Sequence, residues 1–167
     1  MVSVAQGDAS QWRGDAEAIG LVFTHPYAPI PKTLQGKPSI INLYHPPGNA
    51  TRQKQAEAWI GAELEPVSYW GRGHRNITYV ANLPFRNVQL ADLVEEEIQP
   101  GMGWFPLDLP MRVLRAYADL IPPGTTVWDG FMGRGTVGKA CQLLGYRYIG
   151  LDIDASRVAL ARSYLGV

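Results

Sequence analysis

The chain has 167 residues, a length that favours one domain with a single sizeable hydrophobic core. Its composition is 46% hydrophobic and 18% charged, with Lys+Arg 15 against Asp+Glu 15, which is typical of a globular protein and excludes a strongly basic protein that coats nucleic acid. No apolar run is long enough for a membrane span or a signal peptide, so we expect a cytoplasmic protein with no membrane partner.

Cysteine and histidine are too few and too scattered to predict a disulfide or a metal site. The single cysteine, Cys141, cannot form an internal disulfide. The histidines are His25, His45 and His74, and their spacing matches no pattern of metal ligands. We therefore expect no metal dependence.

Two apolar runs in the first third of the chain end at proline, as buried strands often do. They span residues 18–24 and 39–44. The Ala, Gln, Glu and Lys content of residues 50–64 favours a helix. Further strands are predicted at 65–70 and 76–81, because a five-residue loop with two glycines between them suits a hairpin.

The later part of the chain alternates helices and strands. Residues 94–103 combine acidic residues, glycine and proline without an apolar period, so they are predicted to form a solvated polar connector. Beyond it, we expect helices at 108–121, 136–144 and 155–165, and strands at 126–129 and 146–151. This order predicts parallel strands joined by right-handed crossovers.

A glycine-rich turn stands between the strand at 126–129 and the next helix. Its sequence is Asp129-Gly130-Phe131-Met132-Gly133-Arg134-Gly135-Thr136. Glycine lets a ligand approach the backbone, and the start of a helix offers free N–H groups. Asp152 ends the next strand, where a carboxylate can accept hydrogen bonds from a ribose diol. A simpler alternative is a tight turn, with Asp152 as a cap of the last helix.

The acid before the glycines disfavours a nicotinamide dinucleotide. Asp129 would repel a pyrophosphate but would attract an amino group. Residues 136–167 are also too few for the second mononucleotide half of such a domain. A ligand that carries both an amino acid end and a ribose fits these residues better.

Three segments resemble the S-adenosylmethionine-binding region of DNA amino-methyltransferases. D-G-F-M-G-R-G-T and L-G-Y-R-Y-I-G-L-D-I-D are similar to its two motifs, with Gly130 in place of the usual proline, and F-P-L-D-L-P at 105–110 resembles the segment that covers the cofactor. The resemblance extends from about Trp104 to Leu165. It implies that Asp129 faces the methionine amino group and that Asp152 binds the ribose. The other implied cofactor contacts are Phe105, Pro106, Gly130, Phe131, Met132, Gly133, Gly135 and Thr136.

Permuted members of this family carry a D/N/S-P-P-Y segment before the cofactor region, and Thr24-His25-Pro26-Tyr27 resembles it. The resemblance implies that these residues are catalytic. An acceptor would hold the exocyclic amine of an extruded base while the Tyr27 ring stacks on that base. Two alignments stay open, since either Thr24 or His25 can occupy the acceptor position. Neither side chain carries the negative charge that a carboxylate would bring.

Two other interpretations compete with this catalytic segment. Asn82-Leu83-Pro84-Phe85 also resembles the motif, but choosing it would leave too few strands to complete the sheet. Alternatively, residues 25–27 are only a turn that ends a strand. Cys141 is an unsuitable nucleophile because no activating base is near it in the sequence.

The resemblance implies an α/β fold with a Rossmann-like methyltransferase sheet, mostly parallel with one antiparallel strand, and helices on both faces. Residues 1–167 are predicted to form a single core domain with a catalytic half at 1–92, a connector at 93–103 and a cofactor-binding half at 104–167. No strand is expected after the last helix, and no extended target-recognition segment follows residue 81. Both absences suggest a minimal catalytic core.

The implied reaction is transfer of a methyl group from S-adenosylmethionine to the exocyclic amine of adenine or cytosine in DNA. Arg72, His74 and Arg75, with Arg86 nearby, are candidates for phosphate contacts. Because the chain has no evident recognition element, a homodimer or a partner protein could supply one. The alternatives are a binding module without turnover and a methyltransferase for RNA or a small molecule.

Overall fold

A mixed sheet with helices on both sides forms the framework in the computed structural model, which describes residues 1–44, 50–99 and 102–167. The strands of this sheet are β1 (Val2–Gln6), β2 (Ile19–Thr24), β3 (Ser39–Tyr44), β4 (Glu65–Trp70), β5 (Asn76–Ala81), β8 (Thr126–Asp129) and β9 (Arg147–Asp152). A separate ribbon consists of β6 (Glu96–Gln99) and β7 (Met102–Trp104). The α-helices of the described residues are α1 (Thr51–Ile60), α2 (Asp108–Ala116), α3 (Thr136–Leu144) and α4 (Ala155–Leu165).

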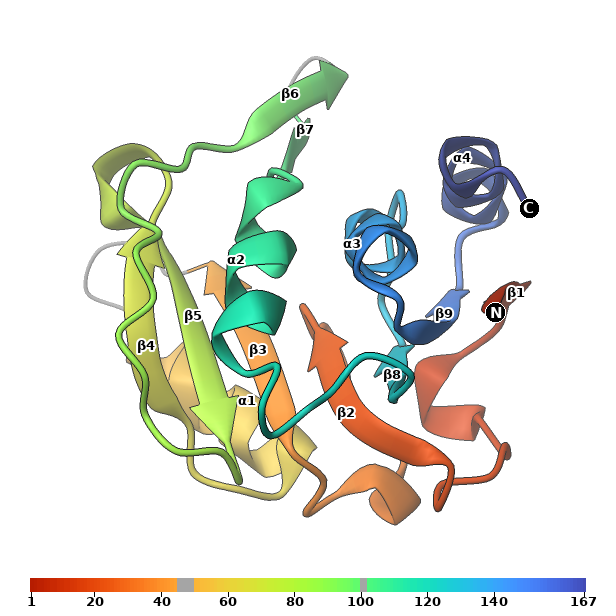
Figure 1. Cartoon of the computed structure of the whole chain (residues 1–167), viewed down its shortest axis with the longest axis horizontal. Coiled ribbons are helices and arrows are strands. Elements are labelled where there is room, and N and C mark those ends of the chain that lie inside the picture. The colour runs from red at the N-terminus through yellow and green to blue at the C-terminus, as the bar shows by residue number, and fades with distance from the viewer. Residues whose placement is uncertain (45–49, 100–101) are drawn as a thin grey trace.

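Seven strands pair in the order β1-β9-β8-β2-β3-β5-β4 (Figure 1). β5 runs antiparallel to both of its neighbours, β3 and β4. The other pairs of this sheet are parallel. The predicted mostly parallel sheet with one antiparallel strand is therefore confirmed, and the hairpin of β4 and β5 is what introduces that strand.

The helices pack on the two faces through separate apolar cores. α2, α3 and α4 bury side chains such as Val113, Cys141 and Val158 against one face. α1 buries Ala56 and Ile60 against the other face, behind the sheet in Figure 1. β2 is apolar along almost its whole length because a parallel strand between two helical layers is buried on both sides. Helices on both faces were predicted, and this is confirmed.

Two predicted helices are too long. α1 ends at Ile60 instead of residue 64, because Gly61 adopts a left-handed φ of 75° that stops the helix. α2 ends at Ala116, although the apolar spacing continues to residue 121. Tyr117 and Ile121 are still buried in the core, since the chain after α2 stays packed on the sheet in turns.

The N-terminal strand β1 was not predicted and completes one edge of the sheet. It pairs in parallel with β9 from Val2 opposite Tyr148 to Gln6 opposite Asp152. Val2 and Val4 pack against the core, while the alternate residues Ser3 and Ala5 are exposed. No strand follows α4 in the described residues, as expected, and the start of the chain instead takes the place beside β9.

The predicted connector also contains regular structure. β6 and β7 form an antiparallel ribbon in which Glu96 lies opposite Trp104. Glu96 and Glu97 are exposed, as expected of a polar connector, but the segment forms two strands that the sequence did not predict. The sequence did not indicate a strand here, because a four-residue strand with two acidic residues and one glutamine shows no apolar alternation.

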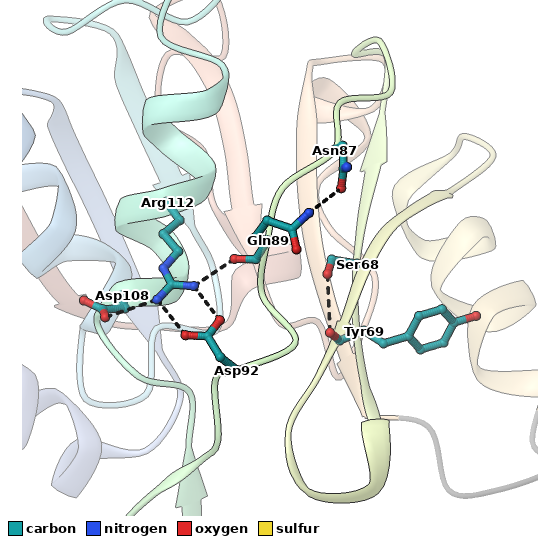
Figure 2. A network of polar contacts seen from close by, with 7 residues as sticks. All are labelled: Ser68, Tyr69, Asn87, Gln89, Asp92, Asp108 and Arg112. Carbon is teal, nitrogen blue, oxygen red and sulfur yellow. Dashed lines mark hydrogen bonds and ion pairs between the residues drawn. The ribbon is translucent and has the colours of Figure 1, made fainter.

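The segment between β5 and the ribbon is held against α2 by arginine clamps. Figure 2 shows Arg112 between the carboxylates of Asp92 and Asp108, with a further bond of 2.9 Å to the carbonyl of Gln89. Arg86 pairs in the same way with Asp119 and lies over the Tyr117 ring. The Arg86 guanidinium is therefore already paired within the fold, and a phosphate contact by it stays a prediction.

No helix within the described ranges is long and apolar enough to cross a membrane.

Candidate active site

The residues predicted to bind ligands converge on one edge of the sheet. Thr24, Asp129 and Asp152 end β2, β8 and β9, which are adjacent and parallel. Carboxyl ends of parallel strands meet at the same edge, which is where open α/β sheets bind their ligands. The topology therefore brings the catalytic segment and the glycine-rich turn together, although more than a hundred residues separate them in the chain.

Asp129 is buried among hydrogen-bond donors from three segments. Thr24 Oγ1 and the Phe131 N–H donate to its Oδ1 at 2.7 Å and 3.2 Å. The Tyr148 hydroxyl donates to its Oδ2 at 3.1 Å. Burial raises the pKa of Asp129 to about 7, although these hydrogen bonds act in the opposite direction. A buried carboxylate of this kind suits a cationic amino group, which would stabilise its charge.

Asp152 holds the glycine-rich turn in place. Its Oδ2 accepts a hydrogen bond of 3.0 Å from the Gly133 N–H, and its Oδ1 accepts one of 3.0 Å from the Asp154 N–H. The side chain is buried. Each oxygen keeps a second lone pair, so the geometry leaves acceptor capacity for a ligand hydroxyl.

A cavity of about 500 Å³ opens at this edge. Five of the predicted cofactor residues line it, and these are Phe105, Phe131, Met132, Gly133 and Thr136. The other predicted cofactor residues, Pro106, Asp129, Gly130, Gly135 and Asp152, are not among its lining residues. Size and lining fit a ligand with aromatic and polar parts.

His25 and Tyr27 line the same cavity, and Thr24 does not. The His25 and Tyr27 rings stack with their centroids 4.8 Å apart and their planes at 27°. His25 Nε2 is buried and finds no hydrogen-bond partner in the described part of the protein. Burial, and then the charge of Arg52, lower the pKa of His25 to about 4, so its imidazole is neutral at neutral pH.

Asn82, in the competing motif, lies far from this arrangement in the topology. It follows β5, which is antiparallel, so the end of that strand is at the opposite edge of the sheet. Its side chain instead donates a hydrogen bond of 3.2 Å to the Lys37 carbonyl.

Gly130, where the family has proline, is required by packing. A Cβ atom at this position would lie 2.2 Å from Cη2 of the Trp128 indole and 2.8 Å from the Ala9 Cβ. Trp128 is fully buried, so it has no room to move away. The departure from the family pattern is thus a consequence of the large side chain two residues earlier.

Arg134 and Trp104 were not singled out by the sequence, yet they shape the turn. Arg134 donates to Glu96 Oε2 at 2.6 Å and to Thr136 Oγ1 at 3.0 Å. The Trp104 indole lies so close to Gly133 that a Cβ there would be 2.3 Å from its Cζ3. Only Gly133 hinted at a close neighbour of the backbone, and no sequence pattern pairs Arg134 with an acid 38 positions away.

The loop predicted to contact nucleic acid is exposed and only partly at the cavity. Arg72, His74 and Arg75 are all exposed, and Arg72 lines the cavity. Glu95 lines it too, accepting hydrogen bonds from Asn76 Nδ2 at 2.5 Å and from the Arg72 N–H at 3.5 Å. Glu95 is therefore part of the cavity wall rather than a solvated connector residue.

In the described part of the chain, no group of three or more His, Cys, Asp or Glu side chains is placed so that it could hold a metal ion. His45 lies outside the described residues. Burial raises the pKa of Cys141, which disfavours its thiolate.

Comparison with known proteins identifies the family. Residues 48–163 match the model of the N6/N4 methyltransferase family, described as DNA methylase. The chain belongs to the N6/N4 DNA methylase family. The prediction of an S-adenosylmethionine-dependent DNA amino-methyltransferase is thereby confirmed. None of the curated proteins matches the sequence.

Solved structures of DNA methyltransferases share the fold. The complex of M1.HpyAVI with S-adenosylmethionine matches with a TM-score of 0.64 and 17% identity over 99% of this chain and 100% of that one. PvuII DNA methyltransferase, which is cytosine-N4-specific, matches with a TM-score of 0.65 and 14% identity over 96% of this chain and 84% of that one. TTHA0409 from Thermus thermophilus is a proposed DNA modification methylase whose structure is complexed with S-adenosyl-L-methionine. It matches with a TM-score of 0.68 and 15% identity over 99% of this chain and 93% of that one.

Asp129→Asn is expected to stabilise the ligand-free protein at alkaline pH. Because burial raises the pKa of Asp129, its contribution to stability is present below the ordinary value of 3.8 and is lost as the pH rises through about 7. Asparagine carries no charge and keeps the acceptor oxygen that Thr24 and Phe131 use. Urea unfolding at pH 8 should give a higher midpoint for the variant than for the wild type, with a smaller difference at pH 5. Equal midpoints at pH 8 would contradict this assignment.

The same carboxylate should make binding of S-adenosylmethionine depend on pH. Below pH about 7, the wild type must release a proton from Asp129 to bind the ammonium group, so its affinity should fall about tenfold per pH unit. Calorimetric titration of the wild type and of Asp129→Asn between pH 6 and 8 measures this. The variant should bind weakly throughout, and a wild-type affinity that is constant across this range would argue against a role for Asp129.

Gly130→Ala is expected to lower the free energy of unfolding by about 1–3 kcal/mol, because its Cβ overpacks the Trp128 indole. Gly7→Ala is the matched control, since its Cβ meets only Leu151 Cδ2 at an ordinary 3.8 Å. Chemical denaturation of both variants provides the comparison. A Gly130→Ala protein as stable as the control would show that the packing around Trp128 yields.

Proposed function

We propose that the chain methylates the exocyclic amine of an extruded adenine or cytosine, with His25 as the hydrogen-bond acceptor and Tyr27 as the stacking residue. The observation that carries the proposal is that both side chains face the cavity formed by the glycine-rich turn. Thr24 is then a positioning residue, because its hydroxyl is used by Asp129 at 2.7 Å.

The arrangement of His25 supports its proposed role. Its Nε2 is buried without a partner among the residues that the structure describes, which is costly unless a ligand completes the bond. Since the pKa of His25 is lowered to about 4, the imidazole can accept a hydrogen bond from an amine at neutral pH. Stacking on Tyr27 restricts the orientation of the ring. The lone pair of Nε2 would thus be directed by packing rather than by a charged partner.

Tyr27 has the exposure that a base-stacking residue needs. Tyr27 is 58% exposed, although it follows a buried strand. One edge contacts the Phe131 ring, with centroids 6.3 Å apart, so the ring bridges the catalytic segment and the glycine-rich turn. Stacking of a base on such a ring contributes about 1–3 kcal/mol.

S-adenosylmethionine, when bound, supplies a methyl group on a sulfonium centre. We propose that Asp129 and Asp152 orient it through its amino group and ribose, while the Trp104 and Phe131 rings exclude water from the cavity. His25 holds the target amine in line with the methyl group and accepts the proton that the amine loses. A weak base suffices, because an aromatic amine becomes a strong acid once it carries a fourth substituent. Positioning then accounts for most of the acceleration.

We further propose that residues 1–167 act as one methyltransferase core in the cytoplasm, where both DNA and the cofactor are available. The division into catalytic residues 1–92 and cofactor-binding residues 104–167 is kept in this proposal, with β1 attached to the cofactor side of the sheet. A homodimer or a partner protein would widen recognition of the target. Arg72, His74 and Arg75 are exposed beside the cavity, as phosphate contacts require.

A methyl-transfer assay on DNA of mixed sequence tests the function directly. Labelled S-adenosylmethionine should yield N6-methyladenine or N4-methylcytosine in the digested product, and the identity of the labelled base tells which amine is used. RNA of the same sequence serves as the comparison substrate. Binding of the cofactor with no transfer to any DNA would refute the proposal and favour a binding module.

Substitutions at the catalytic segment separate the two possible acceptors. His25→Ala should lower single-turnover methylation on the order of 100-fold while cofactor affinity is unchanged, and His25→Gln should recover part of the rate because its amide oxygen accepts a hydrogen bond. Thr24→Val should mainly weaken cofactor binding, by about 1–3 kcal/mol, because Asp129 loses a donor. A rate loss in Thr24→Val with normal cofactor binding, together with an active His25→Ala, would assign the acceptor to Thr24.

A further inference from the structure

A second, smaller cavity lies directly beside the catalytic segment. Its volume is about 250 Å³, and it is lined by Pro26, Tyr27, Leu43, Arg52, Gln55 and Trp59. This is below the range of roughly 300–1,000 Å³ for sites that bind drug-sized ligands, so it suits one small ring system.

The two cavities share a wall. Tyr27 and Arg52 line both of them, so a strand whose target base enters the larger cavity would pass over these two residues to reach the smaller one. Arg52 is half-buried and takes part in none of the ion pairs found among the described residues. It also stands in the first turn of α1, where the helix dipole disfavours a cation. An anion between the two cavities would remove this unfavourable charge.

The side chains on α1 suit a nucleotide. Arg52, Gln55 and Trp59 are spaced so that they lie along one narrow stripe of the helix. Trp59 offers an aromatic face for stacking, and Gln55 offers an amide that can hydrogen-bond the edge of a base. The neighbouring stripe, with Ala56 and Ile60, is buried in the core, so the helix is held firmly while it presents these groups.

We propose that this second cavity binds the base of the nucleotide adjacent to the methylated one, and that Arg52 binds the phosphate between them. The inference rests on the proposed function and adds to it a source of short sequence context within this chain. The substrate region is therefore at least two nucleotides of locally opened or single-stranded DNA.

Abasic substitutions in the substrate test the subsite. In single-stranded oligonucleotides with one target base, removal of the neighbouring base on one side should lower kcat/KM and binding by about tenfold for the wild type, as expected from lost stacking. Removal on the other side should have a much smaller effect. Trp59→Leu should show the tenfold loss on the intact oligonucleotide and no further loss on the abasic one. Gln55→Ala, an exposed position, serves as a second variant should Trp59→Leu fail to fold.

Charge variants on the same helix test the phosphate contact. Arg52→Met should reduce the salt dependence of oligonucleotide binding by about one phosphate, or about 0.7 in the slope of log K against log salt. Lys54→Met is the matched control, because Lys54 is exposed on α1 and lines neither cavity. Its slope should stay close to that of the wild type.

Binding is measured by fluorescence anisotropy as well as by methylation, so the two proposals can fail separately. If the binding losses from Trp59→Leu and from the abasic substitution do not add, but no DNA is methylated, the subsite is supported and the proposed reaction is refuted. The subsite would be overturned if removing the neighbouring base on either side lowered methylation equally in the wild type and in Trp59→Leu. It would also be overturned if removing either base had no effect. Equal slopes for Arg52→Met and Lys54→Met would overturn the phosphate contact.

Discussion

The buried carboxylate of Asp129 is the interaction on which the site depends. It receives hydrogen bonds from Thr24 at the end of β2 and from Tyr148 within β9, so one charge connects both neighbouring strands. Burial disfavours that charge and raises the pKa of Asp129 to about 7. The ligand-free protein therefore holds a group whose charge is fully stabilised only by a bound cation. In the proposed role of Asp129, folding and cofactor binding are coupled through this one residue.

A second constraint keeps the glycine-rich turn against its surroundings. Arg134 extends from the turn to Glu96 in β6, and its guanidinium lies over the Tyr164 ring of α4 with 5.3 Å between them. Because Glu96 lies opposite Trp104 in the ribbon, the same contact sets the position of the indole beside Gly133. The ribbon, the turn and the last helix thus share one ion pair, in which the arginine is buried and the glutamate is half exposed, and removal of Glu96 would leave the buried guanidinium without its charged partner.

The departures from the family motifs have local physical reasons. Gly130 replaces proline because the Trp128 indole fills the space of a Cβ atom. The catalytic segment lacks a carboxylate, and burial instead keeps the His25 imidazole neutral and stacked on Tyr27. Solved DNA methyltransferases share the fold at TM-scores of 0.64–0.68 with only 14–17% identity, so the fold itself tolerates many changes of side chain.

Sequence by itself determined the strand and helix alternation, the mixed sheet, the family and the glycine-rich turn between Asp129 and Thr136. The elements and the turn are local patterns, in which periodicity or a short motif reports the structure of its own residues, and the family and its mixed sheet were implied by the resemblance of those motifs. Only the tertiary structure decided that β1 lies beside β9, that Arg134 pairs with Glu96, and that His25 rather than Thr24 lines the cavity. These are contacts between residues far apart in the chain, and their geometry depends on packing, which no local pattern encodes.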